Sequence, residues 1–298
     1  MKSPKVPELT LKAVVADFLA DLAHAHRSVH TRRGYATDLQ RFLNFYSGSL
    51  RYITTDHIRK FFDTCIHFSI ATQARQQSTL ASFFNWAYRQ ELIDTNPMAR
   101  IERVKLTSPK PNSISREQVE KILAVIPKSR YADQLLFRLL FETGLRVGEA
   151  LSLYIEDLTL TTDDEHINVL GKGGKRRTVL LDDQRLVAML RTYLKQTGYK
   201  YGPLFRALKN FRGGSLRYQS VQQKWSGYCK NAGITCRIHD LRHAHATELI
   251  NEGVSLNTIR KRLGHKNLQT TLRYAEESDA TADAELRAWR RRHDQNRR

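Results

Sequence analysis

A short segment with two prolines divides the chain into parts of different character. Residues 104–113 carry Pro109 and Pro111 and show little apolar patterning. Proline lacks a backbone N–H and restricts the residue before it, so the segment suits neither a helix interior nor a central strand. We therefore expect a linker at 104–113 between two domains, 1–103 and 114–298, each long enough to bury its own core.

The part before the linker shows the periodicity of helices alone. Apolar residues recur three and four positions apart within 11–22, 35–43, 58–62 and 80–88, which predicts four amphipathic helices. Asp56 is the expected N-cap of the third helix, and Asn96-Pro97 is expected to end the fourth segment. Four short helices of this kind form a helical bundle.

The part after the linker mixes helices with a β-hairpin. Ser115 and Gln118 form a capping-box pattern that begins a helix over 116–126, and Gly144 ends a buried helix over 131–143. Strands are expected over 166–170 and 177–181, around a glycine-rich turn. Further helices are expected over 183–196, 217–232, 240–252, 255–263, 267–275 and 280–293. The predicted fold class is mainly α, with a small antiparallel β-sheet or hairpin in the second domain.

The excess of basic residues indicates which kind of partner the chain binds. Lys and Arg number 49 and Asp and Glu 30, a formal charge of +19, and both parts are basic. Phosphates favour such a surface, so we expect a nucleic acid, with the DNA held between the two domains. On charge alone, another basic protein, such as a ribosome-associated factor, is the alternative. No apolar run approaches the roughly 20 residues that cross a bilayer, so we expect no membrane partner.

The cysteines exclude two further classes of protein. Cys65, Cys229 and Cys236 are odd in number and form no CxxC pair. They predict neither a disulfide framework nor a cysteine-rich zinc site, and they fit a reducing, cytoplasmic location.

The first motif with chemical potential is TGLRVGE, residues 143–149. Arg146 follows a helix end and stands where a new helix begins, so its guanidinium and the helix-start amides could bind a phosphate. Glu149 lies three positions on, on the same helical face, and could brace the arginine. On its own, a surface Arg–Glu pair at a turn is the simpler interpretation.

The second motif is the turn GKGGKRR, residues 171–177. Its glycines allow the backbone to approach a ligand closely, and Lys172 on a hairpin can reach into a groove. The spacing of a nucleotide-binding P-loop is absent. An ordinary basic hairpin would have the same composition.

The third motif is HDLRHAH, residues 239–245. His239 and Arg242 are three positions apart, share one helix face and could clamp a phosphate. A zinc site built from His239, His243 and His245 is the alternative. It is disfavoured because no fourth ligand lies at a suitable spacing and the last two histidines point to different faces. We expect neither a metal nor another cofactor.

The fourth motif is LGHKNLQTTLRY, residues 263–274. His265 and Tyr274 would lie about 13 Å apart along one continuous helix, but a break at Gly264 would let the chain fold back. A phenol near two guanidiniums has a lowered pKa and becomes a usable nucleophile. A lone helical tyrosine more often only packs.

Six residues of these motifs, taken in order, resemble the catalytic set of the tyrosine recombinase (phage integrase) family: Arg146, Lys172, His239, Arg242, His265 and Tyr274. The stretches GLRVGEALSL, GKGGKRR, HDLRHAHAT and LGHKNLQTTLRY carry this resemblance. TRRGYATDLQRFLNF and FFNWAYRQELIDTNP resemble the SAM-like core-binding domain of the same proteins. The resemblance covers nearly the whole chain. It implies a helical, DNA-binding core-binding domain over 1–103 and an α+β DNA breaking-rejoining catalytic domain over 114–298.

The resemblance implies a site-specific DNA recombinase that needs neither metal nor ATP. Tyr274 would attack the scissile phosphate and form a 3′-phosphotyrosine, which leaves a 5′-hydroxyl. Arg146 and Arg242 would bind the non-bridging oxygens as negative charge grows on the phosphorus, with Glu149 as a supporting residue behind Arg146. A second 5′-hydroxyl can reverse the step, so cutting becomes strand exchange between two sites in integration, excision or resolution.

The remaining three residues would handle protons, again by resemblance. His265 would donate to the same phosphate, and His239 would act as an acid or base around the tyrosine or phosphate. Lys172 would protonate the 5′-oxygen leaving group. Such groups supply what phosphoryl transfer requires, which is charge stabilisation and a proton for the leaving oxygen.

The sequence departs from the family pattern in two places. Ala244-His245 stands where relatives often have a small or hydroxyl residue followed by Phe, which leaves the packing of His245 open. The arm-type DNA-binding domain of larger phage integrases has no counterpart, so we expect a simple recombinase of the Xer or Cre kind.

The resemblance also implies an assembly. We expect a homotetramer on two synapsed DNA sites, acting alone or with a second recombinase. The helix over 280–293 would dock into a neighbouring protomer through Leu286 and Trp289; a helix folded onto its own domain is the alternative.

Two other functions fit a basic chain with this resemblance. A DNA-binding protein could keep the fold without catalysis, but the complete six-residue set argues against it. A topoisomerase could swivel one duplex with similar residues, but the compact first domain and the expected exchange helix argue against that.

Overall fold

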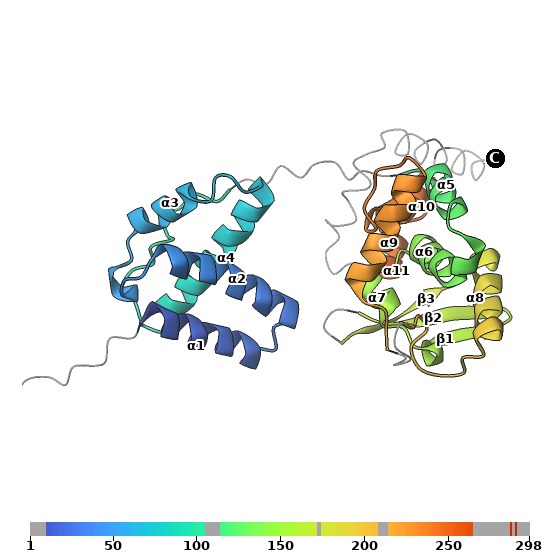
Figure 1. The fold of residues 1–298 in the computed structure, drawn as a ribbon, viewed down its shortest axis with the longest axis horizontal. Helices are drawn as coiled ribbons and strands as arrows, with labels where there is room; N and C mark the ends of the chain where they lie inside the picture. The colour runs from blue at the N-terminus through green and yellow to red at the C-terminus, as the bar shows by residue number, and fades with distance from the viewer. Residues whose placement is uncertain are drawn as a thin grey trace, which may run out of the picture. The chain divides into compact units, whose positions relative to one another are not determined.

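The computed structural model describes residues 10–104, 114–171, 174–207 and 214–264, together with Arg287 and Arg290. The chain divides into two units, Met1–Pro109 and Lys110–Arg298, whose elements are labelled in Figure 1. The predicted linker lies outside the described residues except for Val104, so the domain limits drawn from it stay a prediction. No helix among the described residues is long and apolar enough to span a membrane.

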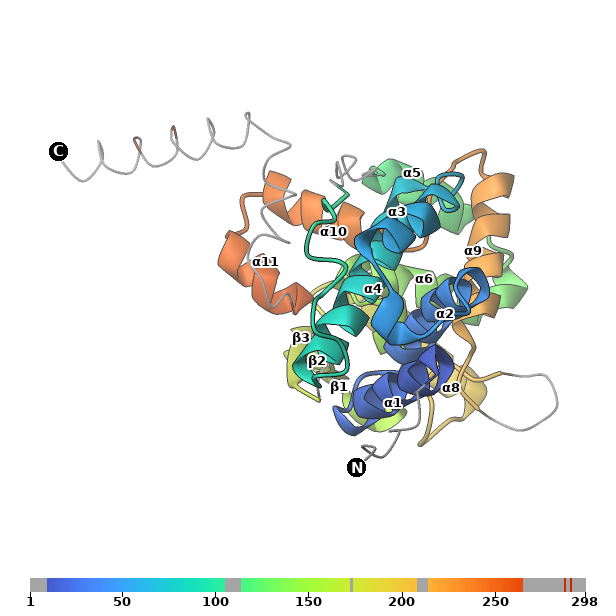
Figure 2. The same ribbon diagram turned by 90° about the vertical axis from the view of Figure 1, so that its left-hand side faces the viewer.

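The first unit is helical throughout its described elements. They are α1 (Leu11–His24), α2 (Val29–Phe45), a 3₁₀ turn (Leu50–Tyr52), α3 (Thr55–Asp63) and α4 (Ile70–Arg89). Each α-helix begins with a Ser or Thr side chain that accepts a hydrogen bond from a backbone N–H of the first turn, which satisfies one of the orphan donors there. Figure 2 shows α1 and α2 side by side.

The predicted N-cap of the third helix is wrong. Thr54, not Asp56, caps α3, and Thr54 and His57 form a reciprocal capping box. Thr54 is extended and its hydroxyl accepts from the backbone N–H of His57, so the helix begins before Asp56. The carboxylate of Asp56 lies in the first turn, where it pairs with Lys60 at 2.9 Å.

Aromatic side chains form the centre of the first unit. The Phe42 ring meets Phe61 edge-on at 5.1 Å between centroids and Phe84 at 5.9 Å. Phe18 meets Phe83 in the same manner at 5.5 Å. All five are buried. Edge-to-face pairs of this kind add to the free energy gained from burial, so α1, α2, α3 and α4 are tied through one aromatic cluster.

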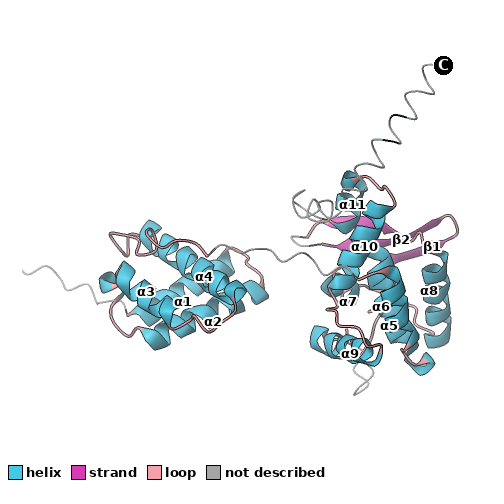
Figure 3. Ribbon diagram, turned by 90° about the horizontal axis from the view of Figure 1, so that it is seen from above, coloured by secondary structure: helices cyan, strands magenta, loops and turns pink. Residues whose placement is uncertain are grey.

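The second unit contains a three-stranded antiparallel sheet and helices that surround α6. Figure 3 shows the strands together at one side of the unit. The described elements, in chain order, are α5 (Arg116–Ala124), α6 (Tyr131–Thr143), α7 (Val147–Leu151), β1 (Leu158–Thr161), β2 (Asp164–Leu170), β3 (Arg176–Leu180), α8 (Gln184–Thr197), α9 (Tyr218–Asn231), α10 (Asp240–Asn251) and α11 (Leu256–Leu263).

The sheet has the order β1-β2-β3, and the predicted hairpin is its β2–β3 pair. Ile167 lies opposite Val179, and both side chains belong to the buried core. The fold class, mainly α with a small antiparallel sheet, is confirmed. β1 was not predicted because four alternating residues, Leu158–Thr161, are too short for a clear signal. The helices predicted over 267–275 and 280–293 lie outside the described residues, except for Arg287 and Arg290 of the second.

Helix α6 is the central element of the second unit. Its last nine residues, 135–143, are all buried, and the Phe137 ring lies 4.8 Å from the Trp225 ring of α9. A helix that is buried on every side has its direction fixed by its neighbours. The end of α6 is therefore a fixed point from which the next residues of the chain are placed.

We expect Phe42→Ala to lower the free energy of unfolding of the first unit. The side chain is fully buried among aromatic rings, so its removal should cost about 3–5 kcal/mol of that unit's stability. Phe45→Ala is the matched control, because Phe45 is 38% exposed and should cost about 1 kcal/mol. Hydrogen exchange of peptides from each unit would measure both losses. Equal losses for the two variants, or a loss in the second unit, would contradict the prediction.

Candidate active site

The site is built where α6 ends and α7 begins. Gly144 ends α6 in the left-handed conformation, at φ +62°, and its N–H donates to the carbonyl of Leu140. A Cβ here would lie 2.5 Å from Leu263 Cδ2 and 2.7 Å from His245 Cδ2. Only glycine fits both the backbone angle and this close approach of α10 and α11.

Arg146 follows as the N-cap residue of α7. Its backbone N–H donates to Glu149 Oε2 at 2.9 Å, and its Nη1 donates to Glu149 Oε1 at 2.9 Å. The Arg146 side chain is 40% exposed whereas that of Glu149 is 8% exposed. The arginine is thus held from behind by a buried carboxylate while its guanidinium keeps a face in solvent, where it could meet an anion.

Glu149 also binds Arg177 of β3. Arg177 Nη1 and Nη2 donate to Glu149 Oε1 and Oε2 at 3.0 and 2.9 Å, a bidentate pair. Burial alone would raise the pKa of Glu149, but the hydrogen bonds from Arg177 and from the Arg146 backbone outweigh it and lower that pKa. The carboxylate therefore stays charged and joins two arginines from separate elements.

Arg242 enters the site from the first turn of α10. Its side chain is buried; Nη1 donates to the carbonyl of Gly144 at 2.6 Å and Nη2 to the carbonyl of Leu263 at 2.8 Å. Gly144 stands two residues before Arg146. The two arginines that the resemblance assigns to the non-bridging oxygens are thus brought to one place by a hydrogen bond between their motifs.

His239 precedes α10 beside both arginines. Partial burial first, then the neighbouring His243 and the positive charges of Arg242 and Arg146, lower its pKa to about 4. Its ring meets that of His243 edge-on at 4.9 Å. His239 is therefore neutral near pH 7. It can accept a proton as a base, or donate a hydrogen bond.

Two arginines cap the end of α11, directly before the predicted His265. Arg177 Nε donates to the carbonyl of Arg262 at 3.2 Å, and Arg242 Nη2 takes the next carbonyl, that of Leu263. The last carbonyls of a helix lack partners and carry partial negative charge. Cationic donors satisfy them here. At Gly264, φ is +67° and a Cβ would lie 3.0 Å from Arg177.

Three predicted site residues, Lys172, His265 and Tyr274, lie outside the described residues. The predicted exchange helix 280–293 does too, except for Arg287 and Arg290. The described part thus brings together Arg146, His239, Arg242 and the supporting Glu149. Among the described residues, no group of three or more His, Cys, Asp or Glu side chains is arranged to hold a metal ion.

His245, whose packing the sequence left open, is buried beneath this site. It is 4% exposed, packs at Gly144 and accepts a hydrogen bond at Nε2 from Arg262 Nε, 3.1 Å away. Burial first, and the charge of Arg262 second, lower its pKa to about 3. The ring is thus neutral and an acceptor at Nε2.

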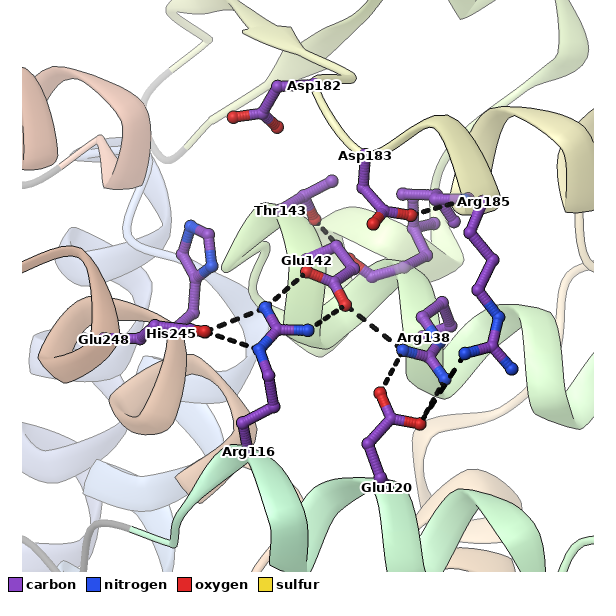
Figure 4. Close-up of polar contacts among 12 residues, drawn as sticks. Arg116, Glu120, Arg138, Glu142, Thr143, Asp182, Asp183, Arg185, His245 and Glu248 are labelled. Carbon is purple, nitrogen blue, oxygen red and sulfur yellow. Dashed lines mark hydrogen bonds and ion pairs between the residues drawn. The ribbon is translucent and has the colours of Figure 1, made fainter. Parts of the chain in front are cut away.

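An ion network lies behind the end of α6, as Figure 4 shows. Arg116 of α5 donates to Glu142 at 3.1 Å and also pairs with Glu248 of α10. The buried Arg138 links Glu142 to Glu120. Removing one partner of such a buried set leaves an uncompensated charge, so the network fixes the last turn of α6 against α5 and α10.

Sequence reasoning did not assign roles to Arg177 and Arg262. Arg177 had a signal, because alternation along β3 places it on the same face as the buried Val179. A charged residue on the buried face of a strand calls for a partner. Arg262 had none, since its three partners come from α10, α6 and the segment before α8.

The sequence matches two family models. Residues 112–281 match the phage integrase family, and residues 15–91 match the phage integrase N-terminal SAM-like domain. The tyrosine recombinase XerD of Shewanella oneidensis is 31% identical over 271 residues, which cover 86% of this chain and 89% of the relative.

Solved structures share the fold. The XerH site-specific recombinase bound to a palindromic difH substrate has a TM-score of 0.73 at 24% identity, covering 89% of this chain and 81% of that chain. A lambda integrase tetramer bound to a Holliday junction has a TM-score of 0.73 at 20% identity, covering 87% and 78%.

The low pKa of His239 predicts a pH dependence of folding. The unfolded residue takes up a proton near pH 6.5 and the folded one at about 4, so between these values the unfolded state binds more protons. The share of stability due to His239 should therefore fall as the pH drops from 6.5 towards 4. Urea unfolding of the protein and of His239→Gln at stepped pH measures that share. An NMR midpoint for His239 near 6.5 would contradict it.

Proposed function

Because the chain belongs to the phage integrase family and is a tyrosine recombinase, an enzyme of site-specific DNA recombination, we propose that it cuts and rejoins double-stranded DNA through a 3′-phosphotyrosine at Tyr274. The observation that carries the proposal is the junction of two motifs. Arg242 donates to the carbonyl of Gly144, two residues before Arg146. The charges of both arginines help to lower the pKa of His239. Two fixed cations beside a neutral imidazole suit a phosphodiester.

The arginines stabilise charge in the proposed reaction. The phenol oxygen of Tyr274 forms a bond to phosphorus as the bond to the 5′-oxygen breaks, and negative charge grows on the non-bridging oxygens. Arg146 and Arg242 bind these oxygens. Glu149 holds Arg146 by two hydrogen bonds, so little reorganisation is needed when the charge develops.

The remaining residues move protons. The phenol of Tyr274 passes its proton to the neutral ring of His239, and the departing 5′-oxygen gains a proton from Lys172. His265 donates a hydrogen bond to the phosphate. His239, neutral near pH 7 because of its lowered pKa, serves as acid or base near the tyrosine. Attack by a second 5′-hydroxyl on the phosphotyrosine reverses these steps and exchanges strands.

The proposed assembly follows the same relatives. We place a core-binding domain at 1–103, a linker at 104–113 and a catalytic domain at 114–298, with DNA between the domains. Four copies would act on two synapsed sites, alone or with a second recombinase, in the cytoplasm on nucleoid DNA. The lambda integrase tetramer on a Holliday junction supports this arrangement. The helix over 280–293, with Leu286 and Trp289, would join neighbouring copies.

Covalent trapping tests the nucleophile. A DNA site is first selected by the protein from a random duplex library and is then nicked beside the cleavage position, so the cleaved fragment diffuses away. The wild-type protein should give an adduct on a denaturing gel. Tyr274→Phe should give none and should bind the same duplex within about twofold, because one hydroxyl is removed. An adduct with Tyr274→Phe would identify a different nucleophile. Tight binding without any wild-type adduct would favour a non-catalytic DNA-binding protein.

A sulfur-substituted substrate tests the general acid. Lys172→Ala should slow cleavage by about 10²–10⁴-fold, the usual contribution of proton transfer. DNA with a 5′-bridging sulfur should restore the rate, because a thiolate leaves without protonation. Arg146→Ala is the control and should stay slow on this DNA, since its role concerns the non-bridging oxygens. No recovery by Lys172→Ala would remove this lysine from the acid's role.

A further inference from the structure

His245 and Arg262 form a buried pair beneath the site. Arg262 Nε donates to His245 Nε2 at 3.1 Å; its Nη2 donates to the backbone carbonyl of Glu142 at 2.9 Å and to Asp182 Oδ1 at 2.6 Å. The Arg262 side chain is 12% exposed. One guanidinium thus joins α11 to α10, to the last turn of α6 and to the segment before α8.

Each residue of the pair lies next to one of the two residues whose carbonyl groups accept hydrogen bonds from Arg242. The His245 ring packs at Gly144, whose carbonyl accepts from Arg242 Nη1. Arg262 directly precedes Leu263, whose carbonyl accepts from Arg242 Nη2. The Gly144 carbonyl, which accepts from Arg242, is therefore positioned next to His245. The Leu263 carbonyl, which also accepts from Arg242, follows Arg262 in the chain.

We propose that His245 and Arg262 are positioning residues for the recombinase chemistry. Their hydrogen bond joins α10 to α11, and the bond from Arg262 to the Glu142 carbonyl joins α11 to the end of α6, so the pair orients Arg242. The inference rests on the proposed function, because it concerns the same site. Neither residue touches the phosphate in this scheme.

The chemistry of the pair is asymmetric. Burial keeps the imidazole neutral, with a pKa of about 3, so its Nε2 can accept from an arginine, which only donates. Asp182 balances the arginine's charge. A phenylalanine at 245 would fill much of the space but would leave a buried N–H of Arg262 unpaired, whereas removing both polar partners leaves no such group.

The expected effect is on rate rather than on DNA affinity. A displacement of about 1 Å in a catalytic group can cost 10²-fold. His245→Phe should therefore slow single-turnover adduct formation at saturating nicked DNA by about 10- to 100-fold, with a dissociation constant for the duplex within about twofold of the wild type. His245→Gln keeps a side-chain acceptor and should react within about threefold of the wild-type rate.

Three further variants complete the experiment. Arg262→Leu should slow the reaction as His245→Phe does. The double variant His245→Phe/Arg262→Leu should lose less than the sum of the two, because residues in contact are not additive. Arg260→Leu is the matched control, since Arg260 is on the same helix and bonds Asn257, and its rate should equal that of the wild type. All rates are measured at a temperature at which circular dichroism shows every variant to be folded.

The outcomes distinguish a failure of the proposed function from a failure of the positioning role. A wild-type protein that forms no Tyr274-dependent adduct overturns the proposed function. A wild-type adduct with an unchanged rate in His245→Phe or Arg262→Leu overturns the positioning role, even when their melting temperatures fall, because the pair would then only stabilise the fold. A His245→Gln variant as slow as His245→Phe also overturns it.

Discussion

The site depends on the capping of one helix end by arginines. The last carbonyls of α11 accept from Arg177 and Arg242, and these side chains come from β3 and α10. Helix-end carbonyls need donors when they are buried, and cationic donors also match the negative end of the helix dipole. The same two arginines reach the α6–α7 junction, Arg242 through Gly144 and Arg177 through Glu149. One capping requirement thus joins the elements that carry Arg146 and Arg242 to the end of α11, the helix that precedes His265.

The arginines around the site are paired with buried acids. Glu149 and Glu142 are 8% and 6% exposed, and each binds two arginines. A buried charge without a partner is costly, so these carboxylates set where the guanidiniums can lie. The chain has a formal charge of +19, yet two buried acids, Glu142 and Glu149, lie behind the site. They bind guanidinium groups on the inner side of the site. The Arg146 side chain, 40% exposed, still faces solvent.

Local sequence signals predicted most elements but not how they meet. Gly144 and the buried apolar run before it predicted α6 with its bounds, Tyr131–Thr143, because a helix end needs only neighbouring residues. The placing of Asp56 as a cap failed, because Thr54 two positions earlier competes for the same role. The predicted site came from the order of its motifs and their resemblance to a family. The bond between Arg262 and His245 joins residues 17 positions apart through tertiary packing, which no local pattern encodes. Cys229 and Cys236, which form no motif, likewise lie 3.4 Å apart between their sulfur atoms.

The protonation states give this site a constant charge. Arginine stays protonated at any working pH, and burial beside arginines lowers the pKa of His239 to about 4 and of His245 to about 3. The histidines therefore add no charge of their own between pH 6 and 8. A phosphate would meet the same positive field across this range, while a neutral imidazole remains able to accept a proton. In the proposed reaction, burial and the nearby arginines thus separate two tasks: the fixed cations would bind the phosphate charge, and a neutral ring would be left to accept a proton.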